Sequence, residues 1–306
     1  MPQPLVRPNQ DKMNGALMVL FQRVGLFAVV AGALLAFQVL AESPALRRAA
    51  PVATASCGSQ RVRQMGEQLP FGPGEALSYA VTVKGAAAGT VDIQLRDRTQ
   101  HAGRTVYPAH VVAESNPIVS LWTRMRAEAV SVVDPEFSTP LNMKTLTRSD
   151  AFTYQEEINF DRGTHKVDVK TVLNKKPWNA SFSSDAELVD ALSVLYYARS
   201  RELVVGQPFC MELYQSRVLW RVTGTLSGIE TVDTDAGPFQ AYAATGNAVI
   251  VGRTGAAAQE KRFTAWMTAD EDRIPVLLKA PTPLGEVVVK LTRFEQGRRL
   301  ARPKRT

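Results

Sequence analysis

The sequence is poor in the residues that build metal and redox centres. Its 306 residues include three histidines and two cysteines. His101, His110 and His165 form no HExxH pattern and no pair at the spacing of metal ligands. The cysteines form no CxxC pair, which argues against a zinc knot or a thioredoxin-like motif. We therefore expect no metal centre and no cofactor.

The chain also lacks the short motifs of common enzymes. It contains no GxSxG nucleophile elbow, no P-loop and no dinucleotide-binding glycine pattern. Glu156 and Glu157 are adjacent in a strand-like stretch, where neighbouring side chains point to opposite faces and do not easily share a substrate. The sequence thus supplies no catalytic residue, which favours a non-enzymatic protein.

Net positive charge is missing from the body of the chain, although the formal total is +7. The first 41 residues carry a net +2 and the last ten, GRRLARPKRT, a net +5, which leaves residues 42–296 with none. Such a body is not expected to bind nucleic acid. The basic residues 297–306 are typical of a disordered, solvated tail, with contact to anionic lipid as the alternative.

One long apolar run stands near the N-terminus. Residues 24–41, VGLFAVVAGALLAFQVLA, contain no charged side chain, follow Arg23 and end at small residues around Ala41. This pattern is typical of a secretory signal, and its length nearly suffices to span a bilayer. We predict a signal sequence or an uncleaved membrane anchor over residues 1–41, with the large domain on the exported side. A flexible linker rich in Ala, Pro and Ser is expected over residues 42–70.

The two cysteines, Cys57 and Cys210, suit an exported chain. In an oxidising compartment the default is one disulfide. Closing so long a loop would remove unfolded-state entropy worth about 5 kcal/mol in the chain-entropy model. A free Cys57 in the linker is one alternative. A lipid-modified Cys57 is less favoured, because TASC lies well past the apolar run and lacks the usual leucine.

From Phe71 onward, apolar and polar residues alternate with a period of two. The clearest strand-like segments are LSYAVTV, GTVDIQL, FTYQEEINF, HKVDVKTVL, VLWRVTGTL, FQAYAATGNAVI, EKRFTAWMT and GEVVVKLTRF. About a dozen strands joined by short turns, without crossover helices, predict an antiparallel sheet. So many strands must curl or split, because an open sheet leaves exposed edges. We predict a mainly β domain over residues 71–296, a curled sheet forming a wide, partly open barrel with one packed α-helix; a β-sandwich is the alternative.

The expected helix lies in SSDAELVDALSVLYYARSREL, residues 183–203. Ser184 and Glu187 have the spacing of a capping box, and an apolar stripe at Leu188, Leu192 and Leu195 follows at helical spacing. Packing against the sheet is the favoured role of this helix. Tyr197 and Arg199 are the candidates for ligand contact, although Arg199 could equally tie the helix to a strand carboxylate.

Arg124, Arg126 and Glu128 alternate along one predicted strand and therefore share a face. If that face points into the barrel, these side chains would line a site for an anionic ligand. If it points outward, they are solvated surface charges, which is the default for such residues.

Four segments in a fixed order resemble a known family. They are GEALSYAVTVKGAAAGTVDI, then DALSVLYYARSREL with VGQPF, then GIETVDTDAGPFQAYA, and FTAWMTADEDRIPVLLKAPTPLGEVVVKL. Together they resemble the bacterial family catalogued as domain of unknown function 3108, over roughly residues 71–295. The positions that match the family pattern are Gly74, Glu75, Tyr79, Gly89, Asp190, Ser193, Tyr197, Arg199, Gly237, Phe239, Trp266, Asp270, Pro275 and Gly285.

The resemblance implies an exported protein of Gram-negative-type bacteria. It also implies a curled β-architecture like the spiral barrels of periplasmic envelope-integrity proteins and, more distantly, the lipoprotein-carrier folds. It supplies no catalytic residue, and the cysteine pair is not part of its pattern. We expect a periplasmic protein that binds a lipid, glycan or protein partner or scaffolds the envelope.

The alternative is an envelope polysaccharide hydrolase with carboxylates such as Glu128 or Glu156 facing the barrel hollow. In either case we expect membrane contact only through the N-terminal segment and the basic tail.

Overall fold

The computed structural model describes Cys57 and residues 68–135, 140–161, 163–184, 186, 188–251 and 260–301. The predicted signal or anchor and most of the predicted linker lie outside these residues. The described part contains one α-helix, α2 (Ser193–Arg199), a 3₁₀ turn, η2 (Val119–Leu121), and 16 strands. In chain order the strands are β1 (Ala76–Val83), β2 (Ala86–Leu95), β3 (Thr99–His101), β4 (Arg104–Ser115), β5 (Met125–Val133), β6 (Pro140–Ser149), β7 (Thr153–Asp161), β8 (Lys166–Leu173), β9 (Lys176–Ser183), β10 (Leu188–Asp190), β11 (Pro208–Gln215), β12 (Val218–Thr234), β13 (Gly237–Ile250), β14 (Glu260–Thr268), β15 (Pro275–Thr282) and β16 (Gly285–Glu295).

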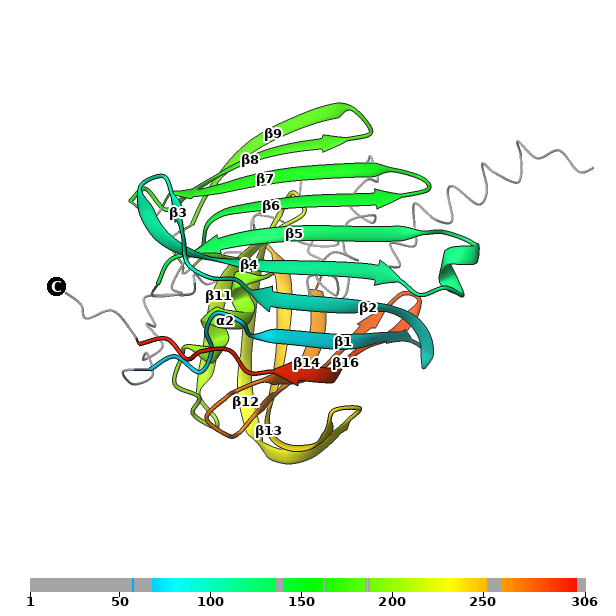
Figure 1. Ribbon diagram of the computed structural model, residues 1–306, viewed down its shortest axis with the longest axis vertical. Helices are drawn as coiled ribbons and strands as arrows, with labels where there is room; N and C mark the ends of the chain where they lie inside the picture. Colours follow the sequence, from blue (N-terminus) through cyan, green and yellow to red (C-terminus); the bar gives the residue numbers. More distant parts are fainter. Residues whose placement is uncertain are drawn as a thin grey trace, which may run out of the picture.

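All strands belong to one continuous sheet that curls back on itself. Its order is β10-β11-β12-β13-β14-β15-β16-β1-β2-β4-β5-β6-β7-β8-β9, with β3 paired to β4, and every pairing except β10 with β11 is antiparallel. The sheet does not close, because its end strands β9 and β10 are not paired with each other. Figure 1 shows β1 to β9 crossing the view in front, with β11 to β13 running steeply behind them. The predicted curled, partly open β-architecture with one packed helix is confirmed.

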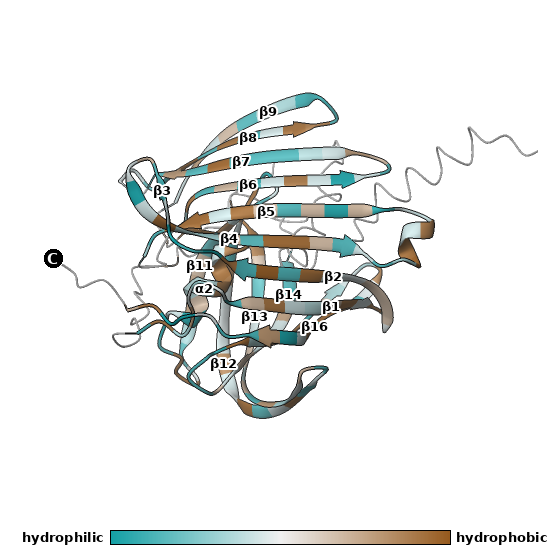
Figure 2. Ribbon diagram, viewed as in Figure 1, coloured by the Kyte–Doolittle hydropathy of each residue, from teal (hydrophilic) through white to brown (hydrophobic). Residues whose placement is uncertain are grey.

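The hydrophobic core lies between the two parts of the curled sheet, and strand alternation builds it. Along the strands, apolar and polar residues alternate in the hydropathy colouring of Figure 2. On one inward row, cross-strand neighbours run from Leu77 through Ile93, Val111 and Ala129, all buried. The packing of such rows is the main favourable term in folding, at about 25 cal/mol per Å² of apolar surface removed from water.

The helix starts later than the sequence predicts. Residues 188–190 form β10 instead of a first helical turn, pairing in parallel with β11 in the register Leu188 with Glu212. The Ser184 hydroxyl accepts a hydrogen bond from the Ala186 N–H at 3.0 Å, and Glu187 lies outside the described residues. The predicted helix start at Ser184 is therefore wrong, because a buried ladder with β11 satisfies the backbone of this segment better than an exposed helical turn.

Asp190 marks the new beginning of the helical segment. Its Oδ1 accepts hydrogen bonds from the N–H groups of Leu192 and Ser193, at 2.8 and 2.7 Å, and its Oδ2 accepts one from the Ser131 hydroxyl at 2.5 Å. Burial raises the pKa of this fully buried carboxyl, although these donors oppose the rise. The residue thus joins the helix start to strand β5.

The chain ends of the domain lie side by side. Leu300 N–H donates to Phe71 O, Leu69 N–H donates to Leu300 O, and Ala301 bridges to Gln68. Arg298 also reaches Asp97 at 2.6 Å. The predicted disorder of the basic tail therefore does not hold for residues 298–301, because backbone pairing with residues 68–73 orders them.

In the described part of the chain, helices are too short or too polar to cross a membrane. The apolar run at residues 24–41, where a signal sequence or membrane anchor is predicted, lies outside the described part.

Candidate functional site

The helix α2 is anchored to the sheet by a buried ion pair. Arg199 Nη1 lies 2.6 Å from Glu75 Oε1, and Arg199 Nη2 donates to Glu75 Oε2 at 2.7 Å. The two side chains are 0% and 1% exposed. Arg199 Nη2 also donates to the carbonyls of Pro70 and Asp272, at 3.2 and 3.0 Å. The guanidinium therefore ties the helix to the start of β1 and to the β14–β15 turn. Of the two roles that the sequence left open for Arg199, ligand contact and a tie to a carboxylate of the sheet, this is the second.

Aromatic rings enclose this ion pair. The Arg199 guanidinium carbon lies 5.0 Å from the ring centroid of Phe71, and the Phe71 and Tyr196 rings meet edge to face at 5.0 Å. Burial alone would lower the pKa of Arg199, but the charge and hydrogen bonds of Glu75 raise it overall. Burial, reinforced by the Glu75 charge, raises the pKa of Tyr196. With its charges paired internally, this cluster holds the fold together and offers no open charge to a ligand.

Other positions that match the family pattern also contact one another. The Tyr79 hydroxyl donates to Pro275 O at 2.9 Å, and the Asp190 N–H donates to the Ser193 hydroxyl at 2.9 Å. A Cβ on Gly89 would stand 2.3 Å from Glu114 O, so this position has no room for a side chain. These matches therefore describe contacts that specify the fold.

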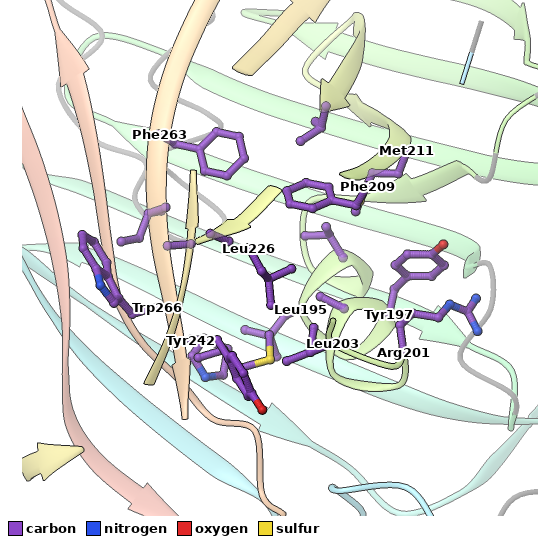
Figure 3. A pocket seen from close by; sticks show the side chains of 18 of the residues that line it. Leu195, Tyr197, Arg201, Leu203, Phe209, Met211, Leu226, Tyr242, Phe263 and Trp266 are labelled. Carbon is purple, nitrogen blue, oxygen red and sulfur yellow. The ribbon is translucent and has the colours of Figure 1, made fainter. Parts of the chain in front are cut away.

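An apolar pocket of about 290 Å³ lies between α2 and the curled sheet, and its lining residues on the sheet come from β1 and from β11 to β16. Most of its lining side chains are aliphatic or aromatic, and Figure 3 shows several of them from different elements. The principal ones are Leu195, Phe209, Met211, Leu226, Phe263 and Trp266. Strand alternation explains the part of the lining that comes from β11, because Phe209, Met211 and Leu213 stand two residues apart and so share one face.

The exposed part of the pocket lining is mixed, because Val204 and Pro208 are exposed there together with polar side chains. Among the polar residues that line the pocket, Glu202, Gln207 and Arg262 are exposed, and Lys261 is half-buried. Burial lowers the pKa of Lys261. An occupant of the pocket would thus meet apolar walls inside and charged groups, two of them basic, at the opening.

The two helix residues that the sequence suggests for ligand contact, Tyr197 and Arg199, lie in different surroundings. Tyr197 lines the apolar pocket, whereas Arg199 does not and is committed to Glu75. The Tyr197 hydroxyl is buried and has no hydrogen-bond partner among the described residues. The Arg201 guanidinium carbon stands 4.2 Å from the Tyr197 ring centroid. Ligand contact by Tyr197 stays a prediction.

Arg126 and Glu128 lie on the outer face of β5, because the inner face presents Ala127 and Ala129 to the core. Arg126 forms ion pairs with Glu114 and with Glu128, and Arg124 precedes the strand and is exposed. The hydrogen bond and charge of Arg126 lower the pKa of Glu128. The structure therefore places these three residues together on the solvent side, away from the apolar pocket.

Glu156 lies on the inner face of β7, opposite to the face of Glu128. Its Oε1 accepts hydrogen bonds from the hydroxyls of Tyr154, Thr171 and Tyr214, at 2.6, 3.3 and 3.5 Å. Burial raises the pKa of Glu156, although the hydrogen bonds from Tyr154 and Thr171 oppose the rise. Glu128 and Glu156 therefore project from opposite faces of the sheet, so that of these two carboxylates only Glu156 lies on the inner side.

The described residues hold no cluster of three or more His, Cys, Asp or Glu side chains suited to a metal ion.

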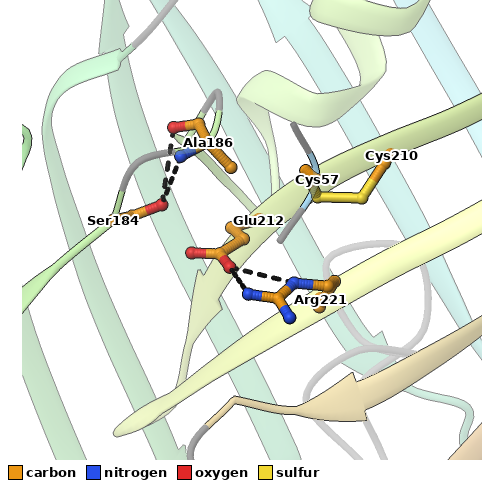
Figure 4. Close-up of a disulfide and its surroundings, with 6 residues drawn as sticks. All are labelled: Cys57, Ser184, Ala186, Cys210, Glu212 and Arg221. Atoms are coloured by element: carbon orange, nitrogen blue, oxygen red, sulfur yellow. Dashed lines mark hydrogen bonds and ion pairs between the residues drawn. A yellow bond between two sulfur atoms is a disulfide. The ribbon is translucent and has the colours of Figure 1, made fainter. Parts of the chain in front are cut away.

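A disulfide joins Cys57 to Cys210, with their Cα atoms 5.3 Å apart (Figure 4). Cys210 lies on β11 between Phe209 and Met211, two of the pocket-lining residues. On the same strand, Glu212 accepts a hydrogen bond from Arg221 of β12 at 2.6 Å. The disulfide therefore holds Cys57 beside β11, the strand that forms one wall of the pocket. A disulfide is also consistent with an extracytoplasmic location.

Sequence reasoning missed most of the pocket. Phe209 and Met211 lie in a strand that alternation did not reveal, and Leu226, Phe263 and Trp266 look like ordinary core positions in their strands. The signal that could have indicated a hollow is the small size of two residues that face it, Ala244 on β13 and its cross-strand neighbour Ala265 on β14.

Comparisons with known proteins agree with the fold. The family model described as "Protein of unknown function (DUF3108)" matches residues 78–292. The chain is similar in structure to a β-barrel-like protein of domain of unknown function DUF1849 from Brucella abortus, with a TM-score of 0.50 and 10% identity, covering 73% of this chain and 97% of that one.

Two further solved structures are more distant. An exported protein with a YmcC-like fold from Bacteroides fragilis has a TM-score of 0.37 and 9% identity, over 76% of this chain and all of that one. A lipoprotein from Parabacteroides distasonis has a TM-score of 0.35 and 10% identity, over the same shares. No curated protein matches the chain.

Proposed function

The chain belongs to the family of proteins of unknown function DUF3108, and we propose that it is an exported cell-envelope protein that binds an amphiphile by its acyl chain. The apolar pocket carries this proposal. Its lining is mostly aliphatic and aromatic, and these side chains lack apolar contacts on the side that faces the hollow. An apolar occupant recovers them, at about 0.8 kcal/mol for each CH₂ group removed from water.

The size and chemistry of the pocket favour one acyl chain over the other partners considered. At about 290 Å³ it is at the small end of ligand sites, which suits a single chain better than a whole lipid. A glycan would bury hydroxyl groups against walls that offer few hydrogen-bond partners, which costs free energy. Of the exposed or half-buried charged residues in the lining, Lys261 and Arg262 are basic and Glu202 is acidic, which on balance favours an anionic polar end on the occupant.

The periplasm is the proposed location. The predicted export signal and the Cys57–Cys210 disulfide support it.

Titration with a fluorescent fatty acid tests the proposal. We expect saturable binding of one molecule per chain, which Ala244→Phe weakens by about tenfold or more. A phenyl group at this pocket-lining position would exclude at least two CH₂ groups, worth about 1.6 kcal/mol, and 1.4 kcal/mol is tenfold in affinity.

The matched control is Thr245→Phe, which adds the same ring at the next residue of β13, an exposed position outside the pocket. This variant should bind like the wild type. Binding that neither substitution changes, or no saturable binding by the wild type, would reject acyl-chain binding in this pocket.

A further inference from the structure

The turn between β4 and β5 holds the three most exposed large apolar side chains of the described residues. Ile118, Leu121 and Trp122 are 63%, 81% and 72% exposed. They lie in or beside η2, which has no buried residue. Figure 2 shows this turn coloured brown where it projects beyond the ends of the strands. Single exposed apolar residues are ordinary, but three together on a projecting turn indicate an interaction site.

Polar contacts hold the turn in shape beneath these side chains. Asn116 Oδ1 accepts a hydrogen bond from the Val119 N–H at 2.7 Å, and Asn116 Nδ2 donates to Ala87 O at 2.8 Å. The hydroxyls of Ser115 and Ser120 lie 2.7 Å apart, and Ser115 Oγ also accepts from the Met125 N–H at 3.0 Å. The apolar groups are therefore presented outward by a built structure and not by a loosely collapsed loop.

The surrounding edge of the sheet carries mostly basic residues. Strands β4, β6 and β8 end there and β5, β7 and β9 begin there, so their turns line one rim (Figure 1). The exposed charges in these turns and the neighbouring β1–β2 and β15–β16 turns, or within two residues of them, are the basic Lys84, Arg124, Arg126, Arg148, Lys175 and Lys176 against the acidic Glu114, Asp150 and Glu286.

We propose that this turn inserts its apolar side chains into an anionic lipid bilayer and docks the domain on a membrane surface. Trp side chains favour the membrane–water interface, since the ring is apolar and its N–H can stay hydrated. Basic residues near the surface are attracted to anionic lipid head groups.

The shape of the site argues for a bilayer over a folded partner. The three side chains project from a convex turn, whereas a stable protein interface needs about 800 Å² on each partner. A bilayer accepts a few protruding side chains without a complementary pocket. The proposed site is separate from the apolar pocket, because none of the turn residues lines that pocket.

Vesicle flotation of the protein purified from the cell envelope tests the proposal. We expect binding to vesicles of phosphatidylcholine with 30% phosphatidylglycerol, weaker binding to phosphatidylcholine alone, and weakening at high salt. The double variant Leu121→Ser/Trp122→Ser should lose at least tenfold in affinity, and Ile118→Ser should weaken binding separately. Ile229→Ser, at another exposed apolar position, is the matched control and should bind like the wild type.

A second readout separates the turn from the N-terminal segment, which contains no tryptophan in residues 1–41. Lipids brominated on their acyl chains should quench part of the tryptophan emission, and Trp122→Phe should remove that quenching. Unchanged flotation of the double variant, or quenching that survives Trp122→Phe, would overturn the proposal. So would self-association in lipid-free buffer that the double variant abolishes, because the turn would then bind a second copy of the chain.

Discussion

Replacing Arg199 by methionine tests whether this residue is a structural anchor or a ligand-binding group. The substitution leaves Glu75 as a buried carboxylate without its cation, and removing one partner of a buried ion pair typically costs about 3–5 kcal/mol. Arg199 also loses its hydrogen bonds to Pro70 O and Asp272 O and its contact with the Phe71 ring. We therefore expect the free energy of unfolding to fall by an amount in the upper part of that range.

Urea unfolding followed by circular dichroism measures this loss, and a double-mutant cycle isolates the pair. Glu75→Leu alone should be strongly destabilising too, because it leaves the Arg199 guanidinium buried without its carboxylate partner. Glu75→Leu with Arg199→Met removes both charges and should cost at least 2 kcal/mol less than the two single changes added together, since a matched apolar pair avoids desolvation.

Two results would refute the reasoning on Arg199. One is a loss of less than about 1 kcal/mol in the single variant, which is the range of an exposed ion pair. The other is additivity within about 0.5 kcal/mol, which would mean that the two side chains do not interact. A variant of normal stability that binds the fluorescent fatty acid poorly would instead make Arg199 a ligand-binding residue.

Further expectations concern a buried carboxyl and the disulfide. Because burial raises the folded pKa of Glu156 above its unfolded value, its contribution to stability is full below about pH 4.5 and falls by about 1.4 kcal/mol per pH unit from there up to the folded pKa. Glu156→Gln should remove this part of the pH dependence of urea unfolding, whereas Glu157→Gln, at a half-buried position on the outer face of β7, should follow the wild type. Identical profiles for all three would contradict the burial argument. Reducing the Cys57–Cys210 bond, which spans 153 residues, should lower the free energy of unfolding by up to about 5 kcal/mol. Alkylation of the unfolded, unreduced protein should add no mass, and two alkylated thiols would show that the bond is absent.

The strands were the most predictable part of the fold. Alternation located β7, β8 and β16 to within one or two residues, because one face of each strand is buried and the other is solvated. The strand predicted over residues 218–226 runs on to Thr234 as one strand, β12, through a bulge between Leu226 and Gly228. Sequence patterns do not distinguish such a bulge from a turn, because both leave an interruption in the alternation.

The helix was the least predictable part. The spacing of Leu188, Leu192 and Leu195 suits a helix, yet Leu188 is buried in β10 beside β11. Only the tertiary partner decides between the two structures, and a single sequence does not identify that partner. For the same reason the sequence left open the role of Arg199, whose carboxylate partner Glu75 lies 124 residues away.

The charged residues of β5 show how far a functional site can be predicted from the sequence. Their shared face followed from alternation, but its direction depended on how the sheet curls. The structure turns Arg126 and Glu128 outward and leaves the inner positions of β5 to small residues. The apolar pocket was not predicted, because its lining comes from seven strands and a helix that only the curled sheet brings together.

Photo-crosslinking with a fatty acid that carries a diazirine near the end of its chain tests acyl-chain binding most directly. After irradiation of the wild-type protein and digestion, we expect the label on peptides that contain the pocket-lining Val194, Phe209 or Leu226, with excess unlabelled fatty acid preventing it. Labelling confined to the β4–β5 turn, or spread over the surface and insensitive to competitor, would contradict the proposal that the pocket between α2 and the sheet holds an acyl chain.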